Sequence, residues 1–286
     1  MADFTIDSEF VAKHIPPRRK DSHKRMNGVA CIVGGSRVYH GAPFLAAMAA
    51  MRTGIDLVYL AVPGLIASPV RALSPDIIVF PLPDGKLTRG ATSKLVKWLP
   101  DVDCAAIGPG LGQQNEEELV ASLERLATKT KKMVLDADAL RPKVLSLSDK
   151  VQIVVTPHAG EFERLFGTKL GSDTSSRSDA VKQQAESNHL TVLLKGPTDI
   201  VSDGSNVGLN TTHTPSMTVG GTGDVLTGIT AGLLAKGLPS FEGACCAVFI
   251  NGSAGLEATE ELGLHIVASD VVSRVAFVMK QFDQIE

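Results

Sequence analysis

The residues best placed to do chemistry lie between positions 218 and 228, where the sequence reads Thr-Val-Gly-Gly-Thr-Gly-Asp-Val-Leu-Thr-Gly. The glycines let a bulky anion approach backbone N–H groups, because no Cβ stands in the way. A phosphate is the expected occupant. The single acid, Asp224, would repel a phosphate, so it fits a different role, in which it takes the proton of a hydroxyl that attacks or leaves with the phosphoryl group. In a second interpretation, Thr222 or Asp224 merely caps a helix.

The residues that follow Asp224 predict the helix that positions it. Apolar side chains recur at helical spacing from Val225 to Leu234, and the pattern ends at Lys236-Gly237. A loop that opens directly into a helix points unpaired N–H groups and the positive end of the helix dipole at one spot. Gly228 and Gly232 lie one turn apart, which predicts close packing of this helix against a neighbouring element of the same chain.

Strand and helix patterns alternate along the rest of the chain, which predicts a single α/β domain with a mostly parallel central sheet and helices on both faces. Strands are predicted at residues 29–33, 57–62, 77–80, 104–107, 133–135, 151–155, 191–194, 200–201 and 207–209. Helices are predicted at residues 44–51, 90–98, 115–128, 178–188, 222–236, 241–260 and 269–281. We assign residues 28–286 to this domain and residues 1–27 to a basic N-terminal lead, expected to be a solvated arm.

Several predicted strands end in glycine or polar residues. These ends are Gly34-Gly35-Ser36, Gly108-Pro-Gly-Leu-Gly112, Asp136-Ala-Asp138, Pro157-His158 and Lys195-Gly196. In an open parallel sheet, ligands bind outside the carboxyl ends of the strands. The sequence therefore predicts that these segments converge on one edge of the sheet.

Each of these segments also has an ordinary structural interpretation. Lys195 suits either nucleotide phosphates or a surface turn. His158 and Glu161 share a face at a predicted helix start, where Glu161 suits the water shell of a magnesium ion and both suit a polar helix entry. Asp136 and Asp138 suit a metal or an ordered water, and an acid such as Asp138 also suits a helix cap.

The composition of the chain indicates which partners and which cellular compartment to expect. The 286-residue chain carries a net charge of −3 and only 5% aromatic residues, so neither nucleic acid nor a membrane surface is an expected partner. The four cysteines have no metal-ligand spacing and predict buried free thiols in a reducing compartment. The first residues are acidic and lack an apolar core, unlike a secretory signal. We expect a cytoplasmic protein.

Taken together, the motifs resemble those of the ADP/ATP-dependent NAD(P)H-hydrate dehydratases, within the ribokinase-like superfamily. The matching segments run in order over residues 25–240. They are Val33-Gly-Gly-Ser36, Gly41-Ala-Pro43, Gly108-Pro-Gly-Leu-Gly112, Leu135-Asp-Ala-Asp-Ala-Leu140, Thr156-Pro-His-Ala-Gly-Glu161, Leu194-Lys-Gly196 and Met217-Thr-Val-Gly-Gly-Thr-Gly-Asp-Val-Leu226. Pro-His-x-Gly-Glu is telling, because sugar and vitamin kinases of the superfamily usually carry Asn-x-x-Glu there.

The resemblance implies repair of NADH or NADPH hydrated at carbon 6 of the nicotinamide ring (NAD(P)HX). The 6-hydroxyl is phosphorylated from ADP or ATP with Mg²⁺, and phosphate then leaves. Asp224 is the implied catalytic base, and Gly221, Thr222 and Gly223 form the anion hole. The implied nucleotide contacts are Lys195, Gly196, Pro197, Thr198, Asp199 and Gly223. The implied contacts to the hydrated dinucleotide are Ala42, Gly110, His158 and Asp224, with Glu161 near the magnesium ion.

Two departures from the family pattern qualify these expectations. Many members carry an Asn-Gly-Asn-like stretch before the final loop, whereas this chain has Leu209-Asn-Thr-Thr-His-Thr-Pro215, so the contacts to the nucleotide base and sugar stay open. Many bacterial members also carry an epimerase domain, and we expect no epimerase activity here. We favour ADP over ATP, because no organelle presequence is present.

Two other functions fit the same residues. A ribokinase-like kinase of a small alcohol or vitamin precursor would leave a stable phosphorylated product. A non-catalytic nucleotide-binding module would bind nucleotide without turnover. The family resemblance also suggests a homo-oligomer, as a tetramer.

Overall fold

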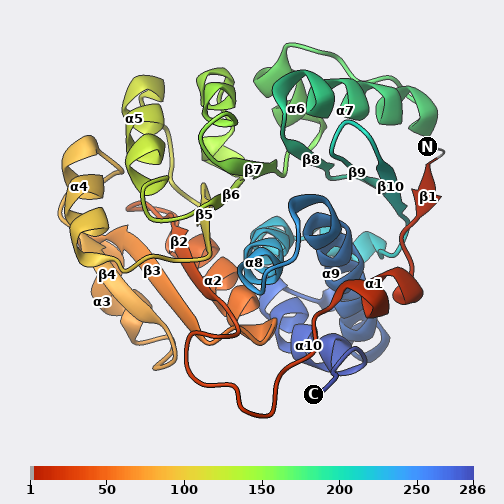
Figure 1. The fold of residues 1–286 in the computed structure, drawn as a ribbon, viewed down its shortest axis with the longest axis horizontal. Coiled ribbons are helices and arrows are strands. Elements are labelled where there is room, and N and C mark those ends of the chain that lie inside the picture. Colours follow the sequence, from red (N-terminus) through yellow and green to blue (C-terminus); the bar gives the residue numbers. More distant parts are fainter. Residues whose placement is uncertain (1–2) are drawn as a thin grey trace.

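One mixed sheet of ten strands runs through the computed structural model, which describes residues 3–286. The strand order is β1-β10-β9-β8-β7-β6-β5-β2-β3-β4 (Figure 1). The strands are β1 (Phe4–Thr5), β2 (Val29–Val33), β3 (Leu57–Pro63), β4 (Ile78–Leu82), β5 (Cys104–Ile107), β6 (Lys132–Leu135), β7 (Gln152–Val155), β8 (Thr191–Leu194), β9 (Asp199–Ser202) and β10 (Val207–Asn210). Strands β2 to β8 pair in parallel, while β9 is antiparallel to both of its neighbours.

Helices cover both faces of this sheet. They are α1 (Ser8–His14), α2 (Gly41–Arg52), α3 (Gly64–Arg71), α4 (Arg89–Trp98), α5 (Glu116–Leu126), α6 (Ala159–Phe166), α7 (Thr174–Asn188), α8 (Thr222–Ala235), α9 (Ser240–Leu262) and α10 (Ala268–Lys280). Figure 1 shows α2, α8, α9 and α10 gathered on one face and α4 to α7 on the other. Alternate residues of one strand enter the two cores: Ile32 of β2 packs on the α8 side and Cys31 on the α5 side. The predicted fold class is confirmed.

Helix α8 lies at the centre of its layer and presses closely on α2. A Cβ on Gly228 would lie 2.1 Å from the backbone oxygen of Ala46, and a Cβ on Gly232 would lie 2.3 Å from Thr53 Oγ1. All of α8 from Val225 onwards is buried. The two glycines therefore serve a contact within the chain, as their spacing predicted, and this contact anchors the helix whose first turn carries Asp224.

The N-terminal segment departs from the expectation of a solvated arm. Strand β1 extends the sheet beside β10, and α1 packs on α9. Ile6, Val11 and Ile15 are buried in the core on the α8 side of the sheet. The prediction of a solvated arm is therefore wrong for residues 4–15, whose three apolar anchors the basic composition obscured, whereas residues 18–21 and 23–26 are exposed.

Helix α3 was not predicted. It follows β3 without a polar break and contains Pro69, a residue type that is unfavourable inside helices. Helix α7 begins at Thr174, four residues earlier than predicted, because the side chain of Asp173 caps it by accepting from Ser176 N–H at 2.9 Å. Within residues 3–286, the structure contains no helix whose length and apolar character would let it span a membrane.

Replacing Gly228 by alanine should destabilise the protein, because the methyl group would collide with the backbone of α2. We expect a loss of about 2–4 kcal/mol in the free energy of unfolding, measured by chemical denaturation. Gly90→Ala is the matched control: a Cβ on this helical glycine would meet only Thr88 Oγ1, at 3.8 Å, and alanine favours helix there. Equal stability of the two variants would contradict the close α2–α8 contact.

Candidate active site

The first turn of α8 is an uncapped helix start. Its N-cap residue, Gly221, has φ 101°, and no side chain accepts from the first turn. Thr222 Oγ1 instead donates to Met217 O at 2.8 Å. The helical bonds begin at Val225 N–H, which donates to Gly221 O at 3.1 Å. The N–H groups of residues 222–224 are thus left for a ligand, and the simple capping interpretation of Thr222 or Asp224 is wrong.

Gly221 cannot be exchanged without disturbing this turn. A Cβ there would lie 2.8 Å from Ala268 Cβ and 2.9 Å from Leu45 Cδ1, in a backbone region that favours glycine. A Cβ on Gly220, by contrast, would have no neighbour within 4 Å. Packing therefore requires glycine at position 221, whereas position 220 has room for a larger side chain.

The carboxyl ends of three neighbouring parallel strands meet beside this helix start. Asp136, Thr156 and Lys195 are the first residues after β6, β7 and β8. Asp136 Oδ1 accepts from Thr156 Oγ1 and from Lys195 Nζ, both at 2.8 Å. Asp136 Oδ2 accepts from Thr227 Oγ1 at 2.7 Å, which ties the strands to α8. Asp136 thus accepts three hydrogen bonds and joins the ends of these strands to α8.

Lys195 joins this carboxylate to the helix start. Its Nζ lies 3.7 Å from Glu161 Oε2, and a Cβ on Gly223 would lie 3.5 Å from the same Nζ. Burial lowers the pKa of Lys195, but the charges of Asp136, Glu161 and Asp224 outweigh burial and raise it. The Lys195 side chain therefore stays protonated next to the free N–H groups of residues 222–224.

Asp224 stands in an environment that resists its ionisation. Burial and the neighbouring charge of Asp136 raise its pKa to about 7, with smaller contributions from Asp138 and Glu161, while Lys195 opposes the rise. A carboxyl group with a pKa near neutrality can exchange a proton at working pH, as a general base must.

His158 and Glu161 form the start of α6. His158 Nδ1 accepts from Glu161 N–H at 3.4 Å, and Glu161 Oε2 accepts from His158 N–H at 2.9 Å, which makes a reciprocal capping box. The His158 side chain is 61% exposed, and the residue pairs with Lys195 in an isolated parallel bridge. The polar-helix-entry interpretation is confirmed, and it leaves the imidazole at the mouth of the site.

Ala42 and Gly110, predicted to contact the same ligand, lie side by side. A Cβ on Gly110, whose φ is 64°, would lie 3.2 Å from Ala42 Cβ and 2.9 Å from Tyr39 Cβ. In the same loop, Gly112 N–H donates to Asp138 Oδ2 at 2.8 Å. Asp138 thus joins the loop after β5 to the segment after β6.

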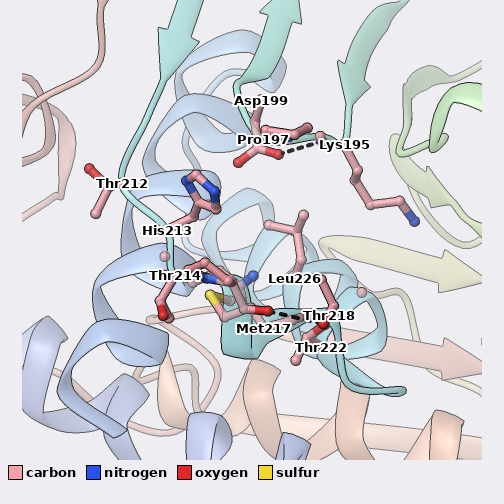
Figure 2. Close-up of a pocket in the computed structure, with 15 residues that line it drawn as sticks. Lys195, Pro197, Asp199, Thr212, His213, Thr214, Met217, Thr218, Thr222 and Leu226 are labelled. Carbon is pink, nitrogen blue, oxygen red and sulfur yellow. Dashed lines mark hydrogen bonds between the residues drawn. The ribbon is translucent and has the colours of Figure 1, made fainter. Parts of the chain in front are cut away.

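A cavity of about 490 Å³ opens beside the start of α8 (Figure 2). It is lined by Lys195, Gly196, Pro197, Asp199, Thr212, His213, Thr214, Pro215, Met217, Thr218, Thr222, Gly223, Leu226, Asn251 and Gly252. In Figure 2, His213 lies between Asp199 and Thr214, opposite Leu226. The cavity extends from the charged end at Lys195 to walls that are largely apolar.

Asp199 is held within this cavity wall. Its carboxylate accepts from Gly196 N–H and from Asn210 Nδ2, both at 3.0 Å. Burial raises the pKa of Asp199 despite these two bonds. Asp199 therefore fixes the turn from Lys195 to β9 as well as bordering the cavity.

The cavity brings together only part of the predicted site. Of the predicted nucleotide contacts, Thr198 is absent from its lining, and the predicted dinucleotide contacts Ala42, Gly110 and His158 lie outside it. Sequence reasoning left the contacts of residues 209–215 open and assigned no cavity role to Met217, Leu226, Asn251 and Gly252. The departure from the family pattern after Leu209 was the signal that pointed there, and the α9 residues gave none.

The fold and the site define the class of protein. It is an α/β protein in which an uncapped, glycine-lined helix start, an acidic residue and a cavity lie together at the carboxyl edge of the sheet. The family model described as NAD(P)H-hydrate dehydratase matches residues 30–276. The chain belongs to the NAD(P)H-hydrate dehydratase family, which confirms the resemblance drawn from its motifs.

Individual relatives agree with this assignment. The ADP-dependent (S)-NAD(P)H-hydrate dehydratase of Nitrosopumilus maritimus is 47% identical over the whole of both chains. The bifunctional NAD(P)H-hydrate repair enzyme Nnr of Pyrobaculum aerophilum is 43% identical, and the match covers 93% of this chain and 53% of the relative.

Solved structures agree as well. The ADP/ATP-dependent NAD(P)H-hydrate dehydratase of Bacillus subtilis, co-crystallised with ATP/Mg²⁺, superposes with a TM-score of 0.85 at 26% identity, covering 99% of this chain and 100% of that one. A hydroxyethylthiazole kinase of Pyrococcus horikoshii shares the fold, with a TM-score of 0.59, 14% identity and 91% of each chain covered.

Replacing Gly223 by alanine should weaken ADP binding at least tenfold, because the new methyl group would enter the space between the free N–H groups and Lys195 Nζ. The backbone there is helical and not left-handed, so the fold should persist. Calorimetric titration with ADP measures the effect. Gly220→Ala is the matched control and should bind as the unaltered protein does; equal affinities of the two variants would exclude this anion site.

Asp224 should make the protein less stable as pH rises. Its folded pKa of about 7 lies above its ordinary value of 3.8, so its ionisation opposes folding increasingly from pH 4 to pH 7. At pH 8 the free energy of unfolding of Asp224→Asn should therefore exceed that of the unaltered protein by up to about 4 kcal/mol. The variant should accordingly have the higher melting temperature at this pH. The two melting curves should converge near pH 4. A lower melting temperature for the variant at pH 8 would contradict the raised pKa.

Proposed function

We propose that this chain dehydrates NAD(P)HX to NADH or NADPH, converting ADP to AMP and phosphate, with Asp224 as the catalytic base. The activity follows from family membership, and the use of ADP is supported by relatives that are 47% identical over their full lengths. The observation that carries the role of Asp224 is its position: a carboxyl group with a pKa of about 7 in the first turn of an uncapped helix.

Two chemical steps are proposed at this helix start. Asp224 takes the proton of the 6-hydroxyl as the oxygen of that hydroxyl attacks the terminal phosphorus of ADP. The bond between this phosphorus and the bridging oxygen breaks, and AMP leaves. The N–H groups of residues 222–224 stabilise the charge on the transferred phosphoryl group. Hydroxide is a poor leaving group and phosphate a good one, so the bond from carbon 6 to the phosphate oxygen then breaks. The adjacent ring carbon loses a proton, and the electron pair of that C–H bond restores the double bond of the nicotinamide ring.

The nucleotide is proposed to occupy the cavity, with its phosphates toward Lys195 and Gly223 and its remaining parts along Gly196, Pro197 and Asp199. Lys195 supplies positive charge at that end, as its raised pKa supports. Thr198 lies within the same turn, so its role stays a prediction. This arrangement assigns one face of the α8 start to the nucleotide and leaves the other to the hydrated dinucleotide.

Magnesium fits this site as a partner of the nucleotide. Within residues 3–286, no group of three or more histidine, cysteine or acidic side chains is arranged to hold a metal ion. Mg²⁺ commonly binds through phosphates and waters with one or two carboxylates, and Glu161, close to Lys195, is the proposed carboxylate. When bound, Mg²⁺ would neutralise charge on the phosphates.

The hydrated dinucleotide is proposed to contact Ala42, Gly110 and His158. Ala42 and Gly110 are adjacent and carry little side chain, so a ring can approach the backbone there. The imidazole of His158 is exposed, and the backbone of His158 pairs with that of Lys195.

Assembly and compartment stay predictions. Large apolar side chains on the surface, among them Leu264, Val267 and Phe277, support the proposed homo-oligomer. Four buried free cysteines support the proposed reducing, cytoplasmic setting.

Replacing Asp224 by asparagine should lower the rate of NAD(P)HX repair by several orders of magnitude, because the amide cannot accept the hydroxyl proton. Recovery of the absorbance of reduced nicotinamide, with hydrated NADH and ADP, measures the rate. Calorimetry should show that ADP binding is largely kept.

Asp149→Asn, an exposed acid outside the site, is the control and should repair at the unaltered rate. An unchanged rate in Asp224→Asn would exclude Asp224 as the base. Stable phosphorylation of another alcohol without recovery would indicate a kinase, and binding without any turnover would indicate a nucleotide-binding module.

A further inference from the structure

One polar side chain of the cavity wall has no structural role. Asn251 lies in the middle of α9, is only 8% exposed and lines the cavity together with Gly252. Helix α9 is pressed against the wall here: a Cβ on Gly252 would lie 1.7 Å from Thr212 O. The carboxamide of Asn251 is therefore held at the cavity by a tightly packed helix.

Asn251 Oδ1 is buried without any hydrogen-bond partner among residues 3–286. A buried polar atom without a partner is costly, and in native proteins such atoms usually point to a missing ligand or water. The neighbouring Asn210 shows the contrast, because its Nδ2 donates to Asp199 Oδ2 at 3.0 Å and also approaches Thr212 O and Val248 O. Asn210 holds the wall together, whereas Asn251 has an unused polar group.

Two further polar side chains of this wall, those of Thr214 and His213, are partnered or exposed. Thr214 Oγ1 bonds with Ser216 Oγ at 3.0 Å, and His213 is exposed, with Nδ1 3.3 Å from Thr211 O. Apolar surface comes from Pro215, Met217 and Leu226. A flat apolar ring with a polar edge matches this combination of apolar walls and one buried carboxamide.

We propose that Asn251 binds the adenine ring of the nucleotide, with Oδ1 accepting from the exocyclic 6-amino group. Asparagine is a common partner of this amino group of adenine. A turn about the terminal torsion of the side chain, which is soft, brings Oδ1 to the cavity that the residue already lines. This inference rests on the proposed function, since it requires the nucleotide phosphates to lie at Lys195 and Gly223.

The test compares two nucleotides that differ only at the proposed contact. Calorimetric titration with ADP and with purine riboside 5′-diphosphate, which lacks the 6-amino group, should show that the unaltered protein prefers ADP by about tenfold. In Asn251→Ala and Asn251→Leu this preference should fall to about onefold. Ser253→Ala, on the same helix but outside the cavity lining, should keep the tenfold preference.

A melting curve without nucleotide checks the fold. Asn251→Leu should melt no lower than the unaltered protein, because an apolar group replaces a buried polar atom that has no partner. If Asn251→Leu keeps the tenfold preference for ADP, or if the unaltered protein shows no preference, the inference is overturned while the proposed function stands. If the unaltered protein binds neither nucleotide, the proposed function fails as well.

Discussion

The ion pair between Lys195 and Asp136 is the contact on which this site depends. Each residue directly follows a strand of the parallel sheet, and the same carboxylate also accepts from Thr156 and Thr227. Ion pairs removed from water add little net stability, because desolvation offsets their attraction. This ion pair instead contributes by positioning: it holds the carboxyl ends of β6, β7 and β8 and one side of α8 in a fixed arrangement.

This arrangement concentrates negative charge where a polyanion must bind. Asp136, Asp138, Glu161 and Asp224 act on one another, and Lys195 compensates only part of their charge. The raised pKa of Asp224 is the direct result. A carboxyl group whose pKa is raised in this way lowers the stability of the folded protein at neutral pH. The same raised pKa lets the group exchange protons near neutral pH, and active sites commonly combine these two effects.

Close backbone approaches make room for this chemistry. A Cβ on Gly108 would lie 1.8 Å from Asp136 O, so the loop after β5 can pass directly over the segment that carries the central carboxylate. At Gly221 the same freedom lets the chain turn into α8 with its first N–H groups free. Both contacts join segments far apart in the sequence, and both fail with any larger residue.

The sequence by itself determined the fold class, most elements and the segments that meet at the sheet edge, because hydrophobic periodicity and strand-end glycines are local signals. It also singled out Asp224 and Lys195 by type and position. Only the tertiary structure decided the rest: that β1 and α1 join the domain, that Asp136 is a bonded hub, that Asp138 bridges two loops and that Asn251 faces the cavity. These depend on which distant residues become neighbours, and burial, partners and pKa values follow from those neighbours rather than from spacing along the chain.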